Sequence, residues 1–329
     1  MTVALPAEPP AAPGAPAPAA APPPRPGRLR LLSLFLTRNP VVLKELRGRM
    51  RGPRAFIVLT LYLLLMSGFV TLLYIVYTAS VNSAVSGNSG QLVGKFVFGA
   101  VVGIELLLVC FIAPAFTAGA ISGERERQTY DLLRTTLLPA QALVLGKLAS
   151  ALSYVLLLLV AALPLQSLAF LLGGVGPQEV VIATLLLVAT AFLFGTSGIF
   201  FSSLMRRTLG STVVTYAFAL MATLGLPLIL VAVIPLGSAL INNAAPGPAL
   251  ETLLIYIFAF FIVTNPIATA VTTEILLVSQ QSAFFFTVPL SSGVNLTLIS
   301  PWLPYMLFCG IMGTLMTIAG IFAVRRTER

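Results

Sequence analysis

Long apolar stretches separated by short polar ones occupy most of the chain after residue 55. Each is longer than the roughly 20 residues that an α-helix needs to cross the hydrocarbon core of a bilayer. Because backbone amides and carbonyls find no water in that core, helices are the elements that we expect for these stretches. The pattern predicts six spans, at about residues 56–79, 96–121, 148–172, 180–204, 209–236 and 302–324.

A further apolar stretch, residues 250–277, is interrupted by Asn265-Pro266. If the chain crosses the membrane six times, every second connecting segment lies on the same side. All of the 19 lysines and arginines except Lys95 lie in the segments of one side. The positive-inside rule makes that side the cytoplasm and places both termini there. No Lys or Arg lies between Arg207 and Arg325, so an even number of crossings joins these two cytoplasmic positions. We therefore predict that residues 250–277 dip into the membrane from the outer side and return.

The N-terminal region divides into two predicted parts before a transmembrane domain at residues 55–329. Residues 1–28 are rich in Pro and Ala, and we expect a disordered cytoplasmic tail that serves as a linker or as a ligand for a Pro-binding domain. Residues 29–54 are basic and amphipathic, which predicts a helix that lies in the membrane interface. The alternative is a charged flank that holds the cytoplasmic end of the first span.

Composition excludes several classes of protein. The chain is 58% hydrophobic and 9% charged, with a mean hydropathy of +1.00, whereas a soluble domain carries about 25% charged residues. An all-α, polytopic membrane protein is the expected fold class. The chain has no His, and its two Cys lie in apolar stretches, which argues against a zinc site, a Ser/His/Asp or Cys/His centre and a disulfide framework. The basic residues behind the net charge of +9 lie beside the spans, where they indicate membrane topology. Nucleic acid is therefore not an expected partner.

Alternating charges and an apolar face share the segment after the second predicted span. Its charged residues are Glu124, Arg125, Glu126, Arg127, Asp131 and Arg134. In one short helix, Arg127 and Asp131 are spaced to pair at i, i+4. The apolar side chains on one face are Tyr130, Leu133 and Leu137. This pattern predicts a surface that docks another protein, and the alternative is a face that lies against the membrane.

The same region resembles the membrane subunits of ABC-2 type transporters. Those subunits often carry ISGERE, then Thr, an acidic residue, Leu-Leu, Pro and a Gly-Lys before the third span. The matching residues here are Ile121-Ser122-Gly123-Glu124-Arg125-Glu126, Thr129, Asp131, Leu132-Leu133, Pro139 and Gly146-Lys147. The run from Asn39 to Arg47 is similar to the amphipathic helix that precedes the first span in this family. The resemblance covers about residues 32–329.

The resemblance implies that residues 123–138 form a coupling helix seated on a separate ABC ATPase subunit. The implied interface residues are Glu124, Arg127, Thr129, Tyr130, Asp131, Leu133, Arg134 and Leu137. It also implies a dimer with a second permease copy, identical or related, in the cytoplasmic (inner) membrane. ATP and Mg²⁺ would then bind the ATPase partner, with no cofactor on this chain, which is not an enzyme by itself. Independently of the resemblance, neither Gly94-Lys95 nor Gly146-Lys147 fits the phosphate-binding pattern GxxxxGK[ST].

Glu105 lies well inside the second predicted span, where an ionised carboxylate is costly. It lines a substrate path, or it is a neutral acid hydrogen-bonded to a Ser, Thr or Tyr of a neighbouring helix. A proton-coupled secondary transporter that uses Glu105, and a non-transporting membrane scaffold, are therefore the alternatives to an ATP-driven exporter. An exporter with six apolar spans suits a hydrophobic or amphipathic substrate, in contact with membrane lipids.

Two further patterns concern helix geometry. Small residues in the fourth span predict close packing of a neighbouring helix; they are Gly195, Gly198, Ser202 and Ser203. Pro164 and Pro227 lie within the third and fifth spans, and both predict kinks.

Overall fold

A computed structural model gives the fold of the chain. It describes residues 53–81, 89–130, 139–171, 174–225, 227–229, 235, 248–280, 282–290 and 293–327. The predicted N-terminal tail, and the predicted interfacial helix up to residue 52, lie outside these residues. Residues 53 and 54 belong to the first described helix, which begins at Pro53, a residue suited to the first position of a helix because its missing N–H has no partner there.

Within the described residues, six helical segments are long and apolar enough to cross a membrane. They are built on α3 (Pro53–Val81), α4 (Ser89–Thr117), α7 (Ala140–Leu171), α8 (Pro177–Leu204), α9 (Thr208–Leu220) and α13 (Trp302–Thr327). All six spans predicted from the apolar pattern are confirmed, and so is the all-α membrane class. The third span begins earlier than predicted, at residue 140, because its first two turns are apolar enough to pack inside the protein.

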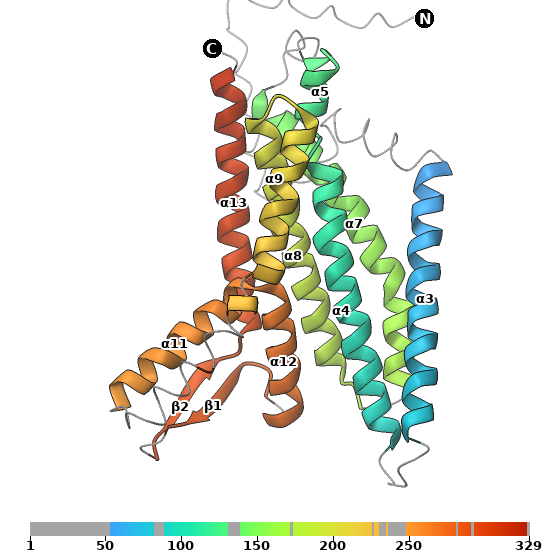
Figure 1. Ribbon diagram of the computed structural model, residues 1–329, viewed down its shortest axis with the longest axis vertical. Coiled ribbons are helices and arrows are strands. Elements are labelled where there is room, and N and C mark those ends of the chain that lie inside the picture. Colours follow the sequence, from blue (N-terminus) through green and yellow to red (C-terminus); the bar gives the residue numbers. More distant parts are fainter. Residues whose placement is uncertain are drawn as a thin grey trace, which may run out of the picture. The chain divides into compact units, whose positions relative to one another are not determined.

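Helix α8 is the centre of the bundle and packs on α4, α7, α9 and α13 (Figure 1). Its sequence is apolar on all sides, as expected of a helix surrounded by others. Gly195 and Gly198 allow two of these neighbours to approach closely. A Cβ at Gly195 would lie 3.0 Å from Leu152 of α7, and one at Gly198 would overlap Thr117 of α4. The predicted close packing at the small residues of this span is confirmed.

The predicted break at Asn265-Pro266 is also confirmed. Helices α11 (Pro248–Thr264) and α12 (Pro266–Gln280) meet there at 115°. Asn265 is buried at the corner, and its side-chain oxygen accepts the amide of Ala268, 2.7 Å away, which caps the start of α12. The sharp bend fits a segment that enters the membrane and returns.

A π-helical turn, η1 (Met221–Gly225), continues α9 just before Pro227. Proline has no N–H, so Pro227 cannot donate to the carbonyl of Thr223 four residues earlier. The side-chain amide of Asn265 donates to that carbonyl instead, at 3.1 Å, and to the carbonyl of Ala222. The π-turn next to Pro227 therefore holds the corner of the bent α11–α12 pair, and the kink predicted at Pro227 stays a prediction. Pro164 lies within the continuous helix α7, and a kink there stays a prediction.

A β-hairpin precedes the last span and was not predicted. Strands β1 (Phe285–Pro289) and β2 (Asn295–Ile299) pair antiparallel, with Phe285 opposite Ile299. The indole N–H of Trp302 donates to the carbonyl of Ala283 at 2.6 Å, which ties the hairpin to the start of α13. The β-branched and aromatic residues on both sides of a Ser-Ser-Gly turn are the signal that sequence reasoning could have used.

Candidate functional site

The charged segment after α4 folds as a short helix and a tight turn. Helix α5 (Ser122–Glu126) ends in a left-handed residue, Gln128, at φ 59°. The amide of Gln128 donates to the carbonyl of Arg125, and the amide of Thr129 donates to that of Glu124. This is the Schellman pattern that closes the C-terminus of a helix. The prediction of a single helix through the charged residues is therefore wrong, since the helix stops at Glu126 and the chain turns before Tyr130.

Serine and arginine side chains fasten α5 to the C-terminal end of α8. The hydroxyl oxygen of Ser202 accepts the amides of Ile121 and Ser122, both at 2.9 Å. These amides belong to the N-terminus of α5, where no carbonyl of the same helix can reach them. In the opposite direction, the guanidinium of Arg125 donates to the carbonyl of Ser203 at 2.8 Å, at the C-terminus of α8. A side chain of each helix therefore forms hydrogen bonds with backbone groups at the end of the other helix.

An ion pair joins the segment to α7. The ammonium of Lys147 lies 3.2 Å from a carboxylate oxygen of Glu124, and Thr129 donates its hydroxyl to the same carboxylate. Lys147 is buried two turns inside α7, so this charge needs a partner. Glu124 and Thr129, both predicted to contact an ATPase, are thus engaged within the chain.

Tyr130 was predicted to lie on an exposed docking face, and the structure instead buries it. Its side chain is only 6% exposed and packs with a cluster under the segment that includes Ile121 and Val144. The guanidinium of Arg125 lies 5.1 Å from the centre of its ring, a cation–π distance. Tyr130 therefore anchors the segment to its own bundle, because apolar area next to this bundle is better buried there than left in water.

The residues of this segment that face outward are Glu126, Arg127 and Gln128. Glu126 accepts the amide of Thr208 at 3.1 Å and also its hydroxyl, at the N-terminus of α9. Of the remaining predicted interface residues, Arg127 is exposed, and four lie outside the described residues: Asp131, Leu133, Arg134 and Leu137. The described part of the segment thus contacts α7, α8 and α9 while presenting a short charged surface.

The comparisons agree with this architecture. The family model described as ABC-2 family transporter protein matches residues 40–321, a range that contains the charged segment, the bent pair and most of α13. The chain belongs to the ABC-2 transporter family. It is therefore a multi-pass membrane protein and a permease of an ABC transporter. Comparison with curated proteins found no match.

Glu105 of this ABC-2 permease is fully buried in α4. The side-chain amide of Gln166, from α7, donates to one carboxyl oxygen at 2.6 Å. Among the described residues, the other carboxyl oxygen of Glu105 and the amide oxygen of Gln166 have no hydrogen-bond partner. The partner is an amide, a group that the sequence analysis did not consider. A role of Glu105 in the substrate path stays a prediction.

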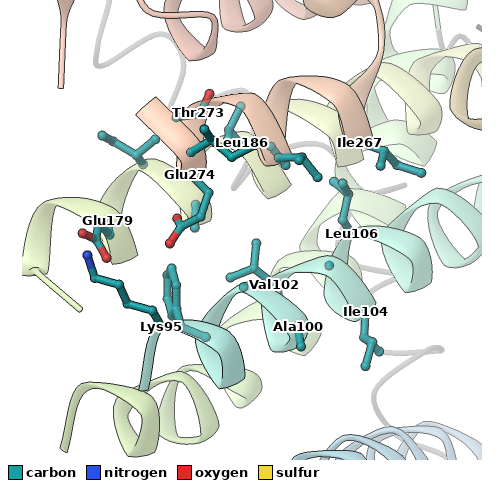
Figure 2. Close-up of a pocket in the computed structure, with 18 of the residues that line it drawn as sticks. Lys95, Ala100, Val102, Ile104, Leu106, Glu179, Leu186, Ile267, Thr273 and Glu274 are labelled. Atoms are coloured by element: carbon teal, nitrogen blue, oxygen red, sulfur yellow. The ribbon is translucent and has the colours of Figure 1, made fainter. Parts of the chain in front are cut away.

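A cavity of about 690 Å³ lies on another side of α4, between α4, α8 and α12 (Figure 2). Its wall includes Ile104 and Leu106 but not Glu105, which points toward α7. Most of the lining is aliphatic or aromatic. The charged residues in the lining are Lys95, Glu179 and Glu274.

Sequence reasoning missed this charged group. Glu179 and Glu274 come from two segments far apart in sequence, and only the bend at Asn265 carries α12 back against α4 and α8. Glu274 lies in an apolar stretch of sequence, as Glu105 does. A carboxylate is costly to bury, so its presence in such a stretch was the available signal of a functional site.

Proposed function

We propose that this chain works with a separate cytoplasmic ABC ATPase and moves a hydrophobic or amphipathic substrate outward across the cytoplasmic membrane. The observation that carries the proposal is the anchorage of the charged segment 122–130 to α7, α8 and α9 within an ABC-2 fold. A segment fixed at three points can pass a push from outside the bilayer into the helices that surround the cavity. In this proposal ATP and Mg²⁺ bind the partner, and a second permease copy completes the path.

The contacts support a route for that push. Arg125 and Ser202 connect the segment to α8, and Glu124 connects it to α7 through Lys147. Helix α8 lines the cavity with Ile182 and Leu186. A displacement of the segment would therefore shift α8 as a rigid element, the kind of helix movement by which packed proteins change state. In this proposal the ATPase contacts the exposed residues Glu126, Arg127 and Gln128 of the segment.

The proton-coupled alternative receives no comparable support. Glu105 does not line the cavity, and its described hydrogen-bond partner is the neutral amide of Gln166. The scaffold alternative leaves the cavity without a role.

The test is copurification of an ABC ATPase with the full chain in mild detergent. Arg127→Glu reverses an exposed charge on the segment, and we expect it to lower the amount of bound ATPase at least tenfold, about 1.4 kcal/mol. The remaining binding should be less weakened by salt than that of the wild type, because salt screens the repulsion that the new carboxylate introduces. Arg326→Glu is the matched control, since Arg326 is an exposed arginine at the end of α13, outside the family match.

The control should keep its ATPase. Equal loss in both variants would mean that net charge alone matters, and an unaffected Arg127→Glu would remove this surface from the interface. Purification of the intact wild-type chain with no ATPase under any condition would contradict the proposed function itself.

A further inference from the structure

Three charged side chains meet at one end of the cavity, each from a different helix. Lys95 comes from the first turns of α4, Glu179 from the first turn of α8 and Glu274 from α12. Figure 2 shows the Lys95 ammonium extending toward Glu179, with the Glu274 carboxylate directed into the same space. Because α4 continues from Lys95 toward α5, this end of the cavity lies opposite the charged segment 122–130.

The charges of this group are not balanced. Two carboxylates face one ammonium, and among the described residues no hydrogen bond or ion pair within 4.0 Å joins Lys95 to Glu179 or Glu274. Glu179 and Glu274 each have one buried carboxyl oxygen without a hydrogen-bond partner in the described part of the chain. Buried carboxylates are costly unless a cation pairs with them. The group therefore has room, charge and free acceptors for one more cation.

The rest of the cavity selects for an apolar tail. Away from the charged end, its wall is formed by side chains such as Phe98, Val102, Leu106, Leu186 and Ile267. Its volume of about 690 Å³ falls within the roughly 300–1,000 Å³ of pockets that bind small organic molecules. A ligand that fills this space needs an aliphatic or aromatic body and one polar end.

We propose that the cavity binds an amphiphile with an ammonium head, its head between Glu179 and Glu274 and its apolar tail along α4, α8 and α12. The inference rests on the proposed transport function and names the class of its substrate. Charge complementarity favours a cationic head over an anionic one, since two carboxylates and only one ammonium line this end of the cavity. Lys95 lines the same end of the cavity without a direct ion pair to either carboxylate, so a ligand ammonium can bind the two carboxylates without first breaking an ion pair. An anionic amphiphile has only Lys95 to bind and meets two like charges.

The test is photolabelling of the purified full chain in dodecyl maltoside micelles, whose head groups carry no charge, with labelled peptides mapped by mass spectrometry. Three photoactivatable probes share one sixteen-carbon tail and differ in the head: hexadecylammonium, hexadecanol and hexadecyl sulfate. We expect saturable labelling of the cavity walls in α4, α8 and α12, with half-saturation by the ammonium probe at a concentration at least tenfold lower than by the alcohol. Sulfate labelling should be weaker than alcohol labelling. Equal labelling by all three heads would overturn the proposal.

Substitutions locate the head group. The double variant Glu179→Gln/Glu274→Gln should raise half-saturation by the ammonium probe at least tenfold and improve labelling by the sulfate. Lys95→Gln should act in the opposite direction and strengthen ammonium labelling. Glu251→Gln is the matched control, a carboxylate in α11 that does not line the cavity, and it should change nothing. Wild-type labelling by the ammonium probe in the double variant would contradict the proposal. If the double variant is not monodisperse, labelling of the wild type and of Lys95→Gln by the three probes still tests the proposal.

The ammonium can belong to a membrane lipid or to a free amphiphile. Micelles that also contain phosphatidylethanolamine separate these sources: competition with the probe identifies a primary-amine lipid as the occupant, and unchanged labelling identifies a free amphiphile. The labelling uses neither ATP nor an ATPase. Its failure therefore leaves the copurification result intact, and a chain that binds the probe without any ATPase would overturn only the proposed function.

Discussion

At the scale of single residues, the buried polar groups divide into those whose hydrogen bonds hold the structure together and those that keep an atom without a described partner. Ser202 and Arg125 satisfy helix ends, and Lys147 pairs with Glu124, so these groups are committed to structure. Glu105 and Gln166 differ, because each keeps one oxygen without a described partner. If Glu105 is a neutral acid, its hydroxyl can donate to the amide oxygen of Gln166, and the pair satisfies itself.

Glu105→Gln tests this interpretation. An amide has nearly the same shape as a carboxyl group and also offers a donor and an acceptor, so we expect expression, monodispersity and transport within twofold of the wild type. Glu105→Leu is the comparison variant. It leaves the Gln166 amide unsatisfied, which costs about 1–3 kcal/mol and should lower the melting temperature in detergent. Loss of transport with normal folding in Glu105→Gln would instead assign the carboxylate to the substrate path.

At the scale of elements, the spans follow from periodicity and length, whereas the connections do not. The six spans and the corner at Asn265 were predictable, since lipid demands long apolar helices and proline interrupts them. The hairpin at β1 and β2 was missed because its two strands are short and lie between much stronger helical signals. The stop of α5 was missed because it depends on a left-handed Gln128, where sequence patterns lead one to expect Gly.

Gly198→Leu tests the packing of α8 on α4. Even a Cβ at this position overlaps Thr117, so a larger side chain must push the two helices apart. We expect a destabilisation of about 1–3 kcal/mol, measured as a lower melting temperature in detergent, with loss of coupling between the segment and the cavity. Gly310→Leu is the control, because nothing lies within 4 Å of the Cβ that would be added there. Equal stability of the two variants would contradict the packing described for Gly198.

At the scale of the whole molecule, the chain brings a cavity and a distant charged segment into one bundle through α8. That the segment docks another protein stays a prediction from its charges, and its inner face was not predicted. Tyr130 was predicted to lie on a docking face, yet it packs in the cluster below the segment, and Arg125 contacts both α8 and the Tyr130 ring. A single sequence shows which residues are apolar or charged, and it does not show which neighbour they face. The cavity illustrates the same limit, since Lys95, Glu179 and Glu274 meet only after α12 folds back.

The central claim is that the charged segment transmits force between an ATPase and the membrane bundle. The most direct measurement places a photo-crosslinking amino acid at Gln128, which is exposed, in intact cells, with the same group at exposed Gln280 as the control. We predict that position 128 crosslinks to a protein carrying a GxxxxGK[ST] phosphate-binding loop, and that position 280, at the far end of α12, does not. Crosslinks to such a protein from position 280, or only lipid adducts at position 128, would contradict the account.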